Sequence, residues 1–137
     1  MAKAINHQFP HLRPQEIAVW ERFLLQFPDR FDSIEYDVRV GEGITLPDNY
    51  QENIRRMALA LTKKRIDAVG TKAGITTLGE IAPSAGTADL GQLMVYKGMW
   101  NREHPGESGL GLMLLTDFAR PDMEGCCEYE GVDLVVV

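Results

Sequence analysis

The sequence predicts an α/β domain in which a central mixed sheet is flanked by helices. Segments with apolar residues at helical spacing alternate with short β-rich segments, in the order helix, strand, helix, strand, strand, helix, strand, helix, strand. The segment 109–118 is almost continuously apolar, which is typical of a strand that is buried on both faces. A second apolar segment, 132–137, is expected to add a final strand that is paired or covered.

Length and composition favour one soluble domain. The chain has 137 residues, of which 45% are hydrophobic and 25% are charged, and its net charge is −6. We expect a single domain over residues 14–137, preceded by a loosely attached N-terminal arm over residues 1–13. There is no apolar run of membrane-spanning length and no signal-peptide core at the start, so we expect no membrane partner.

The negative net charge argues against strong, sequence-independent binding to DNA, because proteins that bind the phosphate backbone usually carry a basic face. One local basic cluster is the exception. It consists of Arg55, Arg56, Lys63, Lys64 and Arg65. These side chains either face phosphates or form a solvated helix face with favourable partners for the helix dipole.

The first expected helix begins at Pro14 and ends before Pro28, with Ile17, Trp20 and Leu24 on one apolar face. A half-buried strand follows, because apolar and polar residues alternate over 32–40. The next helix runs over about 51–61, and its apolar face is formed by Ile54, Met57, Ala58 and Leu61. Near the C-terminus, Cys126 and Cys127 are expected to be free thiols on a short helix.

The segment 64–100 places four polar side chains where they can meet. It is expected to form a strand over 65–70, a strand over 75–82 and a helix over 87–100. Asp67 lies inside the first strand, and Glu80 lies on the same side of the second strand as Ala82. Gln92 and Tyr96 are four residues apart and share one helix face.

These residues resemble a known family. Asp67, Glu80 and a following helix with the pattern Q-x-x-x-Y resemble the PD-(D/E)xK nuclease superfamily, most closely its exonuclease-type branch. The chain also resembles small phage-encoded proteins of this fold. That likeness is carried by a Y-D-x-R-x-G strand over 36–41, by Thr116-Asp117 and by Pro121-Asp122.

The resemblance implies a restriction endonuclease-like fold and a Mg²⁺ site held by Asp67 and Glu80, with Glu16 as a further candidate ligand. It also implies that Gln92 and Tyr96 orient the substrate or the acids. The sequence departs from the family at one position. The family has a lysine two residues after the second acid, and Ala82 stands there in this chain.

A lysine at that position positions or deprotonates the attacking water and stabilises the developing phosphorane charge, which a methyl group does not do. Ala82 therefore predicts impaired or absent cleavage, unless Lys97 or Lys72 takes over the role.

The first hypothesis for the function is a non-catalytic phage protein, a virion structural or head–tail connecting component that binds other phage structural proteins. The alternative is a Mg²⁺-dependent deoxyribonuclease with a migrated lysine, in phage DNA processing or recombination. A third is a nucleic-acid-binding module without cleavage. The expected location is the virion or the host cytoplasm.

Overall fold

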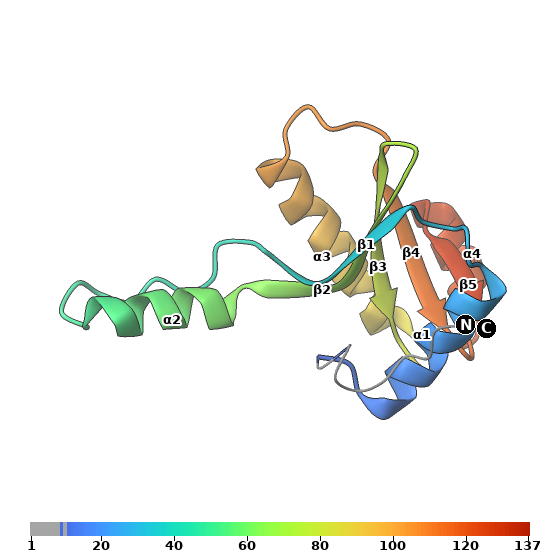
Figure 1. Cartoon of the computed structure of the whole chain (residues 1–137), viewed down its shortest axis with the longest axis horizontal. Coiled ribbons are helices and arrows are strands. Elements are labelled where there is room, and N and C mark those ends of the chain that lie inside the picture. Colours follow the sequence, from blue (N-terminus) through green and yellow to red (C-terminus); the bar gives the residue numbers. More distant parts are fainter. Residues whose placement is uncertain (1–8, 10) are drawn as a thin grey trace.

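A computed structural model describes Phe9 and residues 11–137. Every helix and strand that the sequence predicts is present and in the expected order (Figure 1). The elements are α1 (Pro14–Gln26), β1 (Ser33–Val40), α2 (Glu52–Thr62), β2 (Lys64–Lys72), β3 (Ile75–Ile81), α3 (Thr87–Glu103), β4 (Gly111–Thr116), α4 (Met123–Glu130) and β5 (Asp133–Val136). The predicted α/β class, with a mixed sheet flanked by helices, is confirmed.

The strands form one five-stranded sheet in the order β1-β2-β3-β4-β5. The first three strands are antiparallel neighbours, and β3, β4 and β5 are parallel to one another. Parallel neighbours need a crossover connection, and α3 and α4 supply the two crossovers. Strand β4, which lies between β3 and β5, is buried along most of its length, as its apolar sequence predicts.

Helix α1 lies on one face of the sheet. Its buried side chains Trp20 and Phe23 belong to a core that also contains Met113 and Leu115 of β4. Phe9 and Leu12 are buried in the same core, so the arm expected over residues 1–13 ends earlier than predicted and its last residues belong to the body. The rest of that expected arm, residues 1–8 and 10, lies outside the described residues.

Helix α3 lies on the opposite face. Leu93, Tyr96 and Trp100 pack there with Leu78 of β3 and Leu114 of β4. Helix α4 extends this layer through its buried residues. The two cysteines of α4 are free thiols, as predicted, one exposed and one buried. Within the described chain, no helix is long and apolar enough to cross a membrane.

The segment between β1 and β2, residues 41–63, projects from the body and is called the α2 arm below (Figure 1). A loop and helix α2 form it, and no residue of α2 is buried against any part of the chain that the structure describes. The helix predicted for this region is therefore correct, but its apolar face is exposed. Met57 is 55% exposed and Leu61 is 67% exposed.

Candidate functional site

Two carboxyl groups meet where β2 and β3 run side by side. Val69 and Leu78 are opposite each other in the register of these strands, and both belong to the core beneath α3. Two residues further along each strand, Asp67 and Glu80 face the same side, because strand side chains alternate. The backbone N–H of Ile81 donates a hydrogen bond of 2.9 Å to Oδ2 of Asp67. The predicted acid pair therefore exists.

Burial dominates the electrostatics of this pair. Removal from water and, after it, the charge of Asp67 are the main causes that together raise the pKa of Glu80 to about 9. Burial also raises the pKa of Asp67 to about 6, although the hydrogen bond from Ile81 opposes this shift. The two carboxyl groups are hydrogen-bonded, which favours the ionised form of Asp67 and the protonated form of Glu80. Near neutral pH, Glu80 therefore carries the proton that the two acids share.

Glu16 approaches the pair from α1. Its carboxylate oxygen Oε1 accepts a hydrogen bond of 2.8 Å from the backbone N–H of Arg13, so it caps the start of its own helix. Its negative charge contributes to the raised pKa of both Asp67 and Glu80. The third acid that the resemblance suggests therefore acts on the pair through its charge, and it has a structural role of its own at the start of α1.

Helix α3 brings its polar residues to the same place. The amide Nε2 of Gln92 donates to the hydroxyl of Tyr96 over 3.1 Å, and that hydroxyl donates to the carbonyl of Arg65 over 2.9 Å. Burial raises the pKa of Tyr96, and the charges of Glu80 and Asp67 raise it further. The phenol therefore stays neutral and links α3 to β2 two residues before Asp67.

Ala82, at the lysine position, is 5% exposed and packs in the core beneath α3. Its backbone N–H donates to the carbonyl of Leu115 over 2.9 Å, which continues the pairing between β3 and β4. The methyl group fills this site, and the side chain of residue 82 has no polar atom to offer to either acid.

Neither of the two candidate substitute lysines is ion-paired with the acids in the described part of the chain. Lys72 lies five residues along β2 from Asp67, which is roughly 16 Å of extended chain, and its Nζ is 3.3 Å from Oδ1 of Asp32. Lys97 is exposed on α3 and points about 100° around the helix from Tyr96. None of the ion pairs formed by lysines and arginines in the described ranges includes Asp67 or Glu80.

His11 is the residue at this site that the sequence did not indicate. Its ring nitrogen Nε2 lies 3.2 Å from the carbonyl oxygen of Asp67, and its charge opposes the rise in the pKa of that acid. A histidine beside Pro10 looks like a solvent-exposed residue in the sequence, since nothing local indicates that it contacts a strand 56 residues away.

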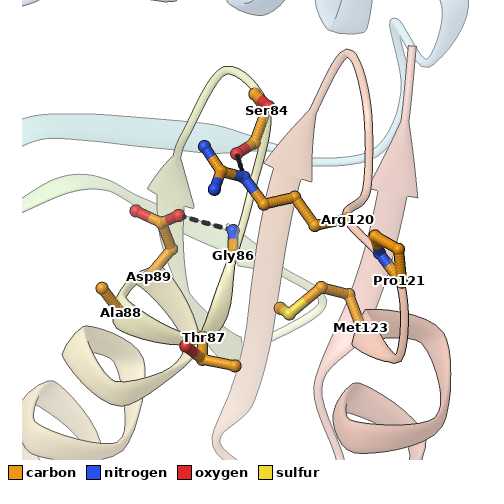
Figure 2. Close-up of a pocket in the computed structure, with 8 residues that line it drawn as sticks. All are labelled: Ser84, Gly86, Thr87, Ala88, Asp89, Arg120, Pro121 and Met123. Atoms are coloured by element: carbon orange, nitrogen blue, oxygen red, sulfur yellow. Dashed lines mark hydrogen bonds between the residues drawn. The ribbon is translucent and has the colours of Figure 1, made fainter.

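A pocket of about 360 Å³ lies at the N-terminus of α3 (Figure 2), and neither Asp67 nor Glu80 is among the residues that line it. Arg120 reaches into it from the loop after β4, and its Nε donates to the carbonyl of Ser84 over 3.2 Å. Asp89 lines the same pocket, accepts a hydrogen bond of 2.9 Å from the backbone N–H of Gly86, and adds to the raised pKa of Glu80. Arg120 and Ser84 carry no signal in the sequence, because their neighbours come from the loops of two different strands.

The donor chemistry of the pair suits a hard cation, since Mg²⁺ prefers carboxylate oxygens. Among the described residues, however, no three His, Cys, Asp or Glu side chains are arranged to hold a metal ion. Asp67 and Glu80 therefore supply two candidate ligands, and Glu16 is engaged with Arg13. Comparison with known proteins adds no further constraint: no family model, no curated protein and no solved structure matches this chain.

Proposed function

We propose that this chain is a phage protein that retains a nuclease-type fold as a scaffold without the cleavage chemistry. Its proposed role is that of a virion structural or head–tail connecting component. One observation carries the non-catalytic part. Glu80 is buried and Asp67 is half-buried beside it, and the position at which the family has its lysine is occupied by the buried methyl group of Ala82.

The topology supports the nuclease-type scaffold. A helix, three antiparallel strands, a crossover helix and a strand parallel to the third form the core, with α2 inserted and α4 and β5 appended. The two acids lie on the second and third strands, and Gln92 and Tyr96 lie on the crossover helix. This is the arrangement that the resemblance to the PD-(D/E)xK superfamily implies for its active-site residues.

The charge of the site supports the loss of catalysis. Hydrolysis of a phosphodiester creates additional negative charge on the phosphate, which a nuclease must stabilise with cations. Here burial and mutual repulsion keep Glu80 protonated, and its neighbours Asp67, Glu16 and Asp89 are also acids. A DNA phosphate brought to this site would meet carboxyl groups without a lysine or arginine of the described chain paired to them.

The assembly part of the proposal draws on two features. The phage-type sequence patterns at 36–41, 116–117 and 121–122 all lie in the described chain. The α2 arm projects from the body with apolar side chains exposed, as expected for a protein that contacts other proteins. Phage structural proteins are the partners that fit both features.

A Mg²⁺-dependent deoxyribonuclease is the second candidate, because the acid pair has been retained and His11 lies against Asp67. Asp67 and Glu80 would hold the ion, and a bound Mg²⁺ would act as a Lewis acid toward the phosphate and lower the pKa of a water molecule. In this alternative, His11 or Lys97 takes the place of the missing lysine as the basic group.

A cleavage assay separates the two candidates. Wild type, Asp67→Ala, Ala82→Lys and Ala82→Met are incubated with linear single- and double-stranded DNA in Mg²⁺ or Mn²⁺. We expect no cleavage by wild type or by Ala82→Met, which matches the length of the new side chain without its charge. Cleavage by Ala82→Lys alone supports a decayed nuclease site. Cleavage by wild type that Asp67→Ala abolishes contradicts the scaffold proposal, whether or not Ala82→Lys folds. Thermal melting of each variant serves as the folding control.

The proposed place in the virion is tested separately. Purified phage particles are disrupted, and this chain is sought in fractions that contain capsid, portal or tail proteins. Recovery with those proteins at a fixed stoichiometry supports the assembly role. Its absence from particles, with the chain found only in infected-cell extract, contradicts that role.

A further inference from the structure

The pocket at the N-terminus of α3 combines two opposite charges with apolar surface. Among the residues that line it, Arg120 supplies a guanidinium and Asp89 a carboxylate, while Pro121 and Met123 supply apolar surface. Its volume of about 360 Å³ lies within the range of small-molecule sites, about 300–1,000 Å³. The pocket is therefore large enough for a small polar molecule.

Arg120 is held in place by the loop that precedes α3. Its backbone N–H donates to the carbonyl of Ala85 over 3.0 Å, and its side-chain Nε donates to the carbonyl of Ser84 over 3.2 Å. The side chain also lies against Gly86, where an added Cβ would be 3.2 Å from Cδ of Arg120. These contacts engage Nε alone. Within the described residues, the terminal nitrogens Nη1 and Nη2 have neither a hydrogen bond nor an ion pair.

Asp89 is fixed in a similar way on α3. Its Oδ2 accepts a hydrogen bond of 2.9 Å from the backbone N–H of Gly86, which leaves Oδ1 to accept from a ligand. Asp89 and Arg120 line the same pocket but do not form an ion pair with each other. Figure 2 shows the guanidinium nitrogens directed toward the side of the pocket on which Asp89 lies. Two fixed charges that do not pair leave space for a ligand between them.

We propose that this pocket binds a small zwitterion, a molecule that carries an anionic and a cationic group a short distance apart, with a free α-amino acid as the simplest case. Nη1 and Nη2 of Arg120 donate to the ligand carboxylate, and Oδ1 of Asp89 accepts from its ammonium group. The apolar surface of Pro121 and Met123 receives the rest of the ligand. A phosphate dianion matches this pocket less well, because Asp89 would repel it.

This inference goes beyond the proposed function. Neither Asp67 nor Glu80 lines the pocket, and binding of a zwitterion does not depend on whether the chain cleaves DNA. The hydrogen bonds that fix Arg120 and Asp89 are formed within the chain, so little side-chain entropy remains to be lost when a ligand binds.

The test measures binding to the nitrogen-15-labelled full chain by NMR, with the backbone amides of Gly86 and Arg120 as reporters. Each standard L-amino acid is titrated in turn. The one that binds most tightly is then compared with its N-acetyl derivative, which lacks the ammonium charge, and with its carboxamide, which lacks the carboxylate. We expect saturable shifts of both amides, and binding of each derivative to be weaker by about tenfold or more, because one charge-assisted contact is lost.

Two variants assign the charges. Arg120→Gln should weaken binding of the amino acid by about tenfold or more but leave binding of its carboxamide as in wild type. Asp89→Asn should do the same with the N-acetyl derivative, and its amide oxygen still accepts from the N–H of Gly86, so the start of α3 is preserved. Arg102→Gln and Glu130→Gln, which change exposed charges at the far ends of α3 and α4, are the matched controls and should bind as wild type does.

The two derivatives are measured on wild type, so the test remains decisive even where a variant fails to fold. Absence of saturable shifts with every amino acid overturns the proposal. Equal binding of the amino acid and both derivatives also overturns it, because the two charges would then play no part. Acetate or inorganic phosphate that binds as tightly as the amino acid overturns it too, since that result indicates a simple anion site.

Discussion

The carboxylate of Asp67 on β2 accepts a hydrogen bond of 2.9 Å from the backbone N–H of Ile81, the residue that follows Glu80 on β3. This bond ties the first acid to the strand that carries the second. A donor at this position stabilises the ionised form of Asp67, whereas burial and the neighbouring charges favour a proton on Glu80. The site therefore assigns different protonation states to two adjacent carboxyl groups.

The raised pKa of Glu80 predicts how stability depends on pH. The pKa of Glu80 is raised from 4.5 to about 9 in the folded protein, so folding favours the protonated form. The stability associated with this proton is complete below the unfolded-state pKa and is lost as pH rises through the range between the two values. Wild type should therefore lose stability from about pH 5 to about pH 9. Glu80→Gln should be more stable than wild type at the upper end, by more than about 1 kcal/mol.

Chemical denaturation at several pH values measures this difference. Glu35→Gln is the control, since Glu35 is an exposed acid on the edge strand β1. Its free energy of unfolding should follow that of wild type at every pH. If the difference between Glu80→Gln and wild type does not grow with pH, the folded protein does not hold a proton on Glu80.

The packing of α1 gives a second prediction. Trp20 is fully buried, and its indole Nε1–H donates to the hydroxyl of Tyr36 over 3.1 Å. Trp20→Ala should lower the free energy of unfolding by about 3–5 kcal/mol, because it leaves a cavity and an unpaired hydroxyl. Leu25→Ala on the same helix should change it by less than about 0.5 kcal/mol, since Leu25 is mostly exposed. Equal effects of the two changes would mean that α1 does not pack as described.

The α2 arm gives a third prediction through Gly43. This glycine has φ = +70°, and an added Cβ would collide with the carbonyl oxygen of Leu59 on α2. Gly74 has φ = +80° with open space around it, so Gly74→Ala carries only the left-handed strain, about 1 kcal/mol. Gly43→Ala should in addition push α2 away from its loop and make the peptide bond after Lys63 or Lys64 a faster site of trypsin cleavage. Equal rates of arm cleavage in the two variants would contradict the described packing of loop and helix.

Much of this fold is predictable because local patterns agree with it. The apolar spacing of α1 and α3 and the alternation in β1 indicate both the type and the buried face of each element. The pairing of Asp67 with Glu80 can also be predicted from neighbouring residues, because a tight turn joins β2 and β3 and sets their register. Such features depend on residues close together in the sequence.

Other features depend on contacts between distant segments. An apolar stripe indicates that one face of α2 is suited to packing, but it does not say which segment covers that face, and the described residues leave it exposed. His11 reaches Asp67 across 56 positions, and Arg120 reaches Ser84 across 36. No periodicity or motif in the sequence indicates contacts between residues so far apart along the chain. The site was therefore predictable as far as its strands and helix, but not in its loops.

The most direct test of the central claim is the titration of the Glu80 carboxyl group in the metal-free wild-type protein, followed by carbon-13 NMR. Among the described residues, no lysine or arginine is ion-paired with Asp67 or Glu80. This arrangement predicts that Glu80 is still protonated at neutral pH, with a midpoint far above the ordinary value of a glutamic acid, and that Ala82→Lys lowers this midpoint. A Glu80 that is ionised at neutral pH in the wild type would contradict the account, because some cation would then be serving the site.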